Sequence, residues 1–147
     1  IAPEHISEKV LALIRKPKID VFERFQQLFL KFTKEAKKEQ YLIPYIISSH
    51  PGADIESEIE LAIYLKRKGY RPRQIQDFLP SPMSISTSMW VTEKDPFTGK
   101  KIYVAKKEND KRLHKSIIQY FKSENHPVII KALRKLHKEY YAKELLK

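Results

Sequence analysis

The chain has 147 residues, of which 41% are hydrophobic, so it is long enough to bury the core of one ordinary domain. It contains no cysteine, which excludes disulfides, thiolate zinc sites, a cysteine nucleophile and thiolate-held iron–sulfur clusters within these residues. No apolar run approaches the roughly 20 residues of a membrane-spanning helix. These features predict a cytoplasmic protein that is not a membrane protein.

The charge is unevenly distributed along the chain. The formal net charge is +11, and residues 100–147 hold 14 Lys and Arg against 5 Asp and Glu, whereas residues 1–99 hold 15 against 13. A basic tail of this kind binds nucleic acid, an anionic membrane or an acidic partner, or it is only a solvated lysine-rich surface. The sequence leaves these alternatives open and places a change of character near Gly99.

The first part of the chain predicts two helices. Ser7 is a suitable N-cap for a short helix that ends before Pro17. The second helix begins near Asp20 and carries an apolar, mostly aromatic stripe at spacings of three and four, which we expect to pack in the core. The stripe consists of Phe22, Phe25, Phe29, Phe32 and Ala36.

The middle of the chain predicts two strands with a helix between them. Residues 41–48 form a nearly continuous apolar run, typical of a strand buried on both faces of a parallel sheet, although Pro44 removes one ladder donor. A tight loop leads to a helix that begins at Asp54, and residues 74–79 read as the next strand. Together with a strand end near Pro3, the strands recur about every 35 residues, the length of a βα unit.

The pattern changes after the second of these strands. Residues 89–92 and 102–105 flank a polar turn and predict a β-hairpin. Two basic helices are expected to follow, each with one apolar stripe that must dock on another element. The predicted fold is therefore α/β: a partial (β/α) barrel of about three βα units in residues 1–82, and a basic C-terminal extension of a hairpin plus two helices in residues 83–147.

The predicted strand ends select the candidate site, because function in parallel α/β folds gathers where the carboxyl ends of the strands meet. The segments are Glu4-His5, residues 48–52 and residues 80–82. Two histidines, a glutamate and several small hydroxyl residues would line one rim, with a helix N-terminus directed towards it. Each residue also has an ordinary structural role open to it: helix capping for Glu4 and His5, turn formation for the serines, and loop ordering for His50.

Several strings of the sequence resemble the YgiQ-type radical S-adenosylmethionine (SAM) proteins. At the strand ends they are IAPEHIS at residues 1–7, YIISSHPG at residues 45–52 and QIQDFLPSP at residues 74–82. Asp95-Pro96, Tyr103-Val104 and RLHK at residues 112–115 resemble the C-terminal extension of the same family. The resemblance runs in order across essentially the whole chain.

The resemblance implies the C-terminal part of a larger radical SAM enzyme, an iron–sulfur oxidoreductase of unknown substrate. In that family a cysteine triad of a partial (β/α)6 barrel binds a 4Fe-4S cluster, which cleaves SAM to a 5′-deoxyadenosyl radical. The triad would lie upstream of Ile1, so we expect the parent protein to hold the cluster and SAM, and this chain alone to hold neither and to be inactive. The resemblance places six residues beside SAM or on the neighbouring rim: Glu4, His5, Ser48, Ser49, His50 and Gly52.

Two other functions stay open from the sequence. A nucleic-acid contact is one, because a cluster of basic residues on the second basic helix, beside two tyrosines, suits phosphate binding. The cluster consists of Lys131, Arg134, Lys135 and Lys138. A structural interaction module is the other: an open sheet edge would pair with the missing N-terminal part of the same protein or with a second copy in a homodimer.

Overall fold

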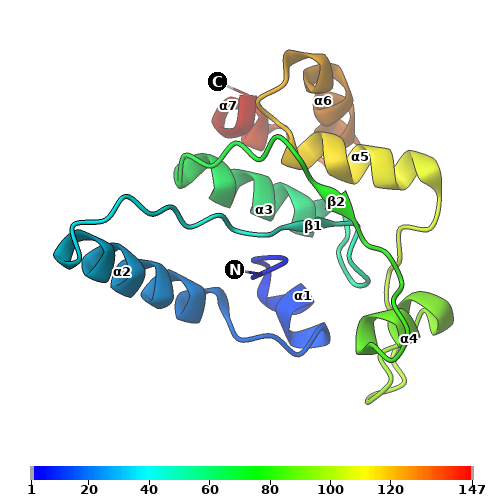
Figure 1. Ribbon diagram of the computed structural model, residues 1–147. Coiled ribbons are helices and arrows are strands. Elements are labelled where there is room, and N and C mark those ends of the chain that lie inside the picture. The colour runs from blue at the N-terminus through cyan, green and yellow to red at the C-terminus, as the bar shows by residue number, and fades with distance from the viewer. Residues whose placement is uncertain (1, 147) are drawn as a thin grey trace.

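A computed structural model describes residues 2–146, and three short parallel strand ends lie at its centre (Figure 1). Glu4 forms an isolated parallel bridge to Ile46, and β1 (Ile47–Ser48) pairs in parallel with β2 (Gln76–Asp77). The order in space is therefore Glu4, β1 and β2, as it is in the sequence. Since the described sheet has two strands and this one bridge, the partial barrel stays a prediction.

Helices connect and follow these strand ends. α1 (Glu8–Leu13) and α2 (Ile19–Glu35) lie between Glu4 and β1, and α3 (Ile55–Arg67) lies between β1 and β2. The remaining helical elements are α4 (Ile85–Thr92), α5 (Glu108–Ile118), the 3-10 turn η1 (Ser123–Asn125), α6 (His126–Lys135) and α7 (Tyr140–Leu146). Within residues 2–146, no helix combines the length and the apolarity needed to cross a bilayer.

One core joins the βα units to the basic extension. α3 packs against α5 and α7, and α5 packs against α6, whereas α2 stands apart from this group (Figure 1). The buried cluster takes Ile59 and Leu65 from α3, Ile117 from α5, Leu133 from α6 and Leu145 from α7. Removal of this apolar surface from water holds the extension on the strand-bearing region.

The prediction that the aromatic stripe of α2 packs in the core is wrong for most of the stripe. Phe22 is buried, but Phe25 and Phe32 are 45% and 57% exposed. The strand predicted after α2 is also open at its start, where Tyr41 and Ile43 are each 77% exposed. The reason is that no other helix or strand of the described chain packs extensively on α2, so a helical period alone did not bury this face.

The hairpin predicted after the βα units is wrong in its first strand, which is part of α4. Ser84 caps this helix, because its Oγ accepts a hydrogen bond from the Thr87 amide at 3.1 Å, and Met89 is buried. The chain does reverse afterwards, where Lys94 and Lys101 form an isolated antiparallel bridge. No strand flanks this bridge in the described chain.

The second predicted basic helix is two helices, so the extension has three main helices after α4 rather than two. α6 ends at Lys135, His137 adopts a left-handed conformation with φ of 53°, and α7 begins at Tyr140. The amide of Lys138 donates to the carbonyl of Leu133 at 2.9 Å. This bond closes the last turn of α6 and stops its propagation.

Candidate functional site

A cavity of about 240 Å³ opens beside the carboxyl ends of the strand ends. Glu4 lines it from the first strand end, His50 from the loop after β1, and Asp77 from β2. Its other polar lining residues are Tyr45, Gln76, Ser81, Ser84 and Ser86. Polar groups from segments distant in sequence therefore converge on one small cavity, and convergent polar groups of this kind can fix the orientation of a small ligand.

Glu4 and His50 form the titratable pair of this cavity. His50 Nε2 lies 3.4 Å from Glu4 Oε2, and Lys16 Nζ lies 2.9 Å from Glu4 Oε1. The contact with His50, and then that with Lys16, lowers the pKa of Glu4 against the opposing effect of burial. The His50 ring packs on Phe78 with 4.9 Å between ring centroids. Glu4 is therefore a held, ionised acceptor at the wall of the cavity.

The backbone that carries this pair is strained. Glu4 and Ser49 both adopt left-handed conformations, with φ of 65° and 59°, which non-glycine residues rarely occupy. The Glu4 amide donates to the Tyr45 carbonyl at 3.0 Å, and the Ile47 amide donates to the Glu4 carbonyl at 2.9 Å. These bonds fix the strand end on which Glu4 sits, so the strain is held by neighbouring structure.

A fully buried carboxylate, Glu58 of α3, lies among the segments that carry this pair. Its Oε1 is 3.1 Å from His114 Nδ1 and accepts a hydrogen bond from the Ser49 amide at 3.0 Å, and its Oε2 lies 3.8 Å from His5 Nε2. Burial alone would raise the pKa of Glu58, but the contacts with His114 and His5 outweigh it and lower the pKa to about 2. Glu58 is therefore ionised at neutral pH.

Of the six residues predicted at the rim, only Glu4 and His50 line the cavity. His5 is fully buried: its Nε2 faces Glu58 and its Nδ1 accepts a hydrogen bond from the Ser7 amide at 3.0 Å. Ser48 and Ser49 are buried too, with their hydroxyl oxygens 3.4 Å apart. The sixth residue, Gly52, does not line the cavity either.

Gly52 serves the backbone of the loop. Its φ is 89°, and a Cβ at this position would come within 2.3 Å of the Leu13 Cδ1 atom of α1. Its amide donates to the carbonyl of Tyr103 at 2.8 Å. Only glycine combines this conformation with such a close approach.

The N-terminus of α3 is occupied by the chain's own carboxylate. Asp54 Oδ1 accepts a hydrogen bond from the Ser57 amide at 3.0 Å, and Asp54 Oδ2 lies 2.6 Å from Lys9 Nζ. The positive end of the helix, which the sequence predicted to face the rim, is therefore satisfied by an N-cap residue.

The predicted basic cluster is divided between α6 and the segment after it. Lys131, Arg134 and Lys135 are exposed on α6. Lys138 lies beyond the end of that helix and forms an ion pair with Glu56. The placement of Lys138 on the second basic helix is wrong, because α6 ends at Lys135.

Sequence reasoning missed the roles of Glu58, His114 and Asp77. A signal for Glu58 was present: it lies three residues after Ile55 and four before Ala62, on the apolar stripe of α3. A charged residue on a buried helix face needs a partner. Nothing in the local pattern of residues 108–118 identifies His114 as that partner, since the contact spans 56 positions.

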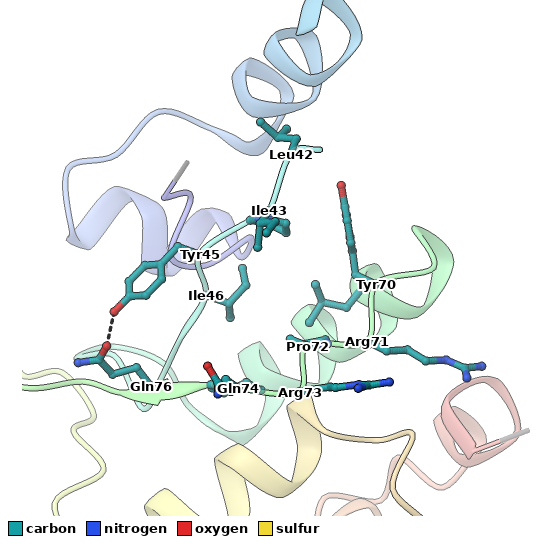
Figure 2. Close-up of a pocket in the computed structure, with 13 residues that line it drawn as sticks. Leu42, Ile43, Tyr45, Ile46, Tyr70, Arg71, Pro72, Arg73, Gln74 and Gln76 are labelled. Atoms are coloured by element: carbon teal, nitrogen blue, oxygen red, sulfur yellow. Dashed lines mark hydrogen bonds between the residues drawn. The ribbon is translucent and has the colours of Figure 1, made fainter. Parts of the chain in front are cut away.

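A larger cavity, of about 810 Å³, lies between residues 42–46 and 70–76 (Figure 2). It is lined mostly by apolar side chains, and its lining contains no acidic residue and no histidine. Figure 2 shows the Tyr45 hydroxyl directed at the Gln76 side chain, to which it donates at 2.5 Å. No group of three or more His, Cys, Asp or Glu side chains in residues 2–146 is arranged to hold a metal ion.

Comparison with known proteins gives the following similarities. The family described as "Domain of unknown function (DUF3362)" matches residues 73–141. A UPF0313 protein of Clostridium botulinum (strain 657 / Type Ba4) is 45% identical over 139 residues, which cover 95% of this chain and 22% of the relative. The UPF0313 protein of Methanosarcina acetivorans is 44% identical over 135 residues, covering 92% of this chain and 18% of the relative. No solved structure gives a significant match.

The chain spans about a fifth of the length of the curated relatives it matches. The UPF0313 protein of Methanocella arvoryzae gives the same picture, with 41% identity over 133 residues, 90% of this chain and 22% of the relative. The match to residues 73–141 runs from β2 to the start of α7 and so includes Asp77 and His114. The chain is thus similar, over nearly all of its own length, to one segment of the much longer UPF0313 proteins, and it contains a DUF3362 match.

Proposed function

We propose that this chain is the C-terminal part of a cytoplasmic radical SAM iron–sulfur oxidoreductase, whose strand ends form the SAM and substrate side of a partial (β/α) barrel. The similarity to much longer UPF0313 proteins supports a larger parent. The YgiQ-like strings coincide with the three strand ends. The observation that carries the proposal is the cavity beside these strand ends, where Glu4 and His50 meet.

The two cofactors fit this chain to different degrees. The 4Fe-4S cluster does not fit, because the chain has no cysteine, and no step of radical initiation is assigned to these residues. SAM fits the cavity in its hydrogen-bonding chemistry: an ionised carboxylate and neighbouring hydroxyl groups complement ribose hydroxyls and an ammonium group. SAM would supply the 5′-deoxyadenosyl group of the reaction, and the residues of this chain would bind and orient SAM.

Glu4 would act as the main acceptor. Lys16 and His50 hold its two carboxylate oxygens from different sides, which limits its rotation and prepares it for a ligand. Phe78 packs on His50 and lines the same cavity, so it excludes water from one wall. Asp77 and the serines of the lining offer further polar contacts to the substrate side.

The test uses the complete parent protein. After anaerobic reconstitution we expect iron and sulfide in the amounts of a 4Fe-4S cluster, and SAM binding measured by equilibrium dialysis. Glu4→Gln should weaken SAM binding about tenfold, since a hydrogen bond to a charged group is lost. Glu8→Gln is the matched control, because Glu8 is 69% exposed and pairs only with Lys18 among the described residues. A parent without a cysteine triad, or one that binds neither iron nor SAM, contradicts the proposal.

A nucleic-acid contact on α6 is a second candidate, favoured by the exposure of Lys131, Arg134 and Lys135. Anisotropy titration with duplex RNA and DNA at about 50 and 200 mM salt should show steeply salt-dependent affinity. The double substitution Lys131→Ala with Arg134→Ala should reduce the logarithmic salt slope by about 2. Lys31→Ala with Lys34→Ala on α2 is the matched control. Absence of binding at the lower salt concentration would contradict this role.

A further inference from the structure

We propose that the C-terminal extension acts as a positioning element for the rim loop, defined here as residues 48–53, and that His114 is its principal positioning residue. The proposal rests on the proposed function in one respect, namely that the rim loop carries His50, which holds the proposed SAM acceptor Glu4. The contacts that support it belong to the described chain and do not depend on a cofactor.

The first contact runs from the extension to the rim loop through a buried charge. His114 of α5 donates from Nδ1 to Glu58 Oε1, and the same oxygen accepts the Ser49 amide. All three groups are buried, and both His114 and Glu58 have no exposed surface. A buried carboxylate keeps its orientation only while its hydrogen-bond partners remain, so His114 determines where the acceptor for Ser49 lies.

The same carboxylate also faces the first strand end. Glu58 Oε2 lies 3.8 Å from His5 Nε2, and His5 follows Glu4 directly. Glu58 is therefore the point at which both strand ends that carry the Glu4–His50 pair meet the extension. A shift of this carboxylate would move the two halves of the pair relative to each other.

The second contact is made by the backbone. The Tyr103 carbonyl accepts a hydrogen bond from the Gly52 amide at 2.8 Å, and Leu13 of α1 lies so close to Gly52 that a Cβ there would come within 2.3 Å of Leu13 Cδ1. The Tyr103 ring lies beside the His114 ring, with 5.9 Å between centroids, so the two contacts come from one patch of the extension. The rim loop is thus fixed at Ser49 and at Gly52, on either side of His50.

A third contact attaches α1, the helix that packs on Gly52, to the extension. Arg15 follows α1 and pairs with Asp95 at 3.5 Å, and its guanidinium lies 4.3 Å from the centroid of the Phe97 ring. Both partners belong to the turn of the extension. α1, which contains Leu13, is therefore attached to the same extension whose Tyr103 carbonyl binds the Gly52 amide.

Four variants of the complete parent protein separate positioning from general stability. His114→Leu removes the donor and leaves Glu58 without it, whereas His114→Asn keeps an N–H donor close to the position of Nδ1. Ile117→Val on the same helix removes one buried carbon and so destabilises the core, while His114 and Glu58 themselves are unchanged. His137→Asn is the surface control, because asparagine tolerates the left-handed conformation found there.

The first readout is hydrogen exchange of peptides covering residues 48–53, which needs no cofactor. His114→Leu should accelerate exchange at this loop about tenfold, the effect expected when a hydrogen bond to a charged group is lost. His114→Asn should restore most of the protection, and Ile117→Val and His137→Asn should leave the loop as in the wild type. Unchanged exchange in His114→Leu, or equal acceleration in Ile117→Val, overturns the proposal.

The second readout is the SAM dissociation constant of the reconstituted parent, which should rise about tenfold in His114→Leu and recover in His114→Asn. If the wild-type parent binds no SAM, the proposed function fails while the exchange result still decides the positioning role. If SAM binds and His114→Leu changes neither exchange nor affinity, the positioning role fails while the proposed function stands.

Discussion

The two sides of this molecule carry similar apolar residues but differ in how far these residues are buried. On one side, α3, α5, α6 and α7 bury a continuous set of aliphatic side chains, and the Glu58 carboxylate of α3 is fully buried beside His114 of α5. On the other side, α2 and the segment that follows it leave Phe32, Tyr41 and Ile43 more than half exposed. An apolar stripe on a helix is therefore not evidence of burial until another element is found to cover it.

The covered side should respond most strongly to loss of side-chain volume. Leu133→Ala on α6 should lower the free energy of unfolding by about 2–5 kcal/mol, because Leu133 is fully buried and its removal leaves a cavity. Leu30→Ala on α2 is the matched change, and we expect a loss below about 1 kcal/mol because Leu30 is 56% exposed. Urea unfolding of both variants checks this. Equal losses would show that the α2 face is covered in solution and would break the comparison.

Acid should weaken the covered side through Glu58. The pKa of Glu58 in the folded chain is about 2 against an ordinary value of 4.5, so its stabilisation is present above about pH 4.5 and is lost as the pH falls towards 2. The difference corresponds to about 3 kcal/mol of unfolding free energy. Urea unfolding at a series of pH values measures it. Glu58→Gln should remove this part of the pH dependence, and Glu60→Gln, exposed on the same helix, should retain it.

The close packing of α1 on the rim loop should be measurable at Gly52. Gly52→Ala and Gly99→Ala both place a Cβ on a residue of positive φ, but only at Gly52 does the Cβ meet another atom, Leu13 Cδ1. We expect Gly52→Ala to cost up to about 1 kcal/mol more unfolding free energy than Gly99→Ala, since the end of the Leu13 side chain must move to admit the Cβ. Adding Leu13→Ala should relieve Gly52→Ala in a double-mutant cycle. Equal losses for the two glycine variants would contradict the close packing of α1 on the rim loop.

Surface charge should contribute least. Arg67 and Glu144 pair between α3 and α7 at 2.6 Å, with side chains 70% and 38% exposed. We expect Arg67→Met to lower the unfolding free energy by less than about 1 kcal/mol, and we expect this small effect to disappear in high salt. Thermal unfolding at low and high salt provides the measurement. A larger loss would mean that ion pairs, rather than the aliphatic core, hold α7 on α3.

Local rules predicted the parts of the fold that local interactions decide. Asp54 begins α3 and Gly69 follows its end, as capping and left-handed closure require. The pairing of Glu4, β1 and β2 follows the strand spacing read from the sequence. The helix at residues 85–92 was predicted in part as a strand, because the β-branched residues near Trp90 favour a strand. The N-cap at Ser84 is the local signal for the helix.

The candidate site was only partly predictable, because its organisation depends on contacts between distant segments. Glu4 and His50, two of the residues expected at the rim, line one cavity, since strand ends in parallel sheets converge. The burial of His5 beside Glu58 depends on a partner from α5, at position 114, and no periodicity of the first strand end reports it. A local sequence pattern does not reveal the role of a side chain when that role depends on a contact with a distant segment.

The bond between the Gly52 amide and the Tyr103 carbonyl has an evolutionary consequence. Because the acceptor is a main-chain oxygen, any residue at position 103 supplies it, and substitutions there leave this attachment intact. Relatives can therefore diverge at position 103 while keeping the loop in the same place. Co-variation between positions 52 and 103 would be weak, so a comparison of sequences alone would not detect this backbone hydrogen bond.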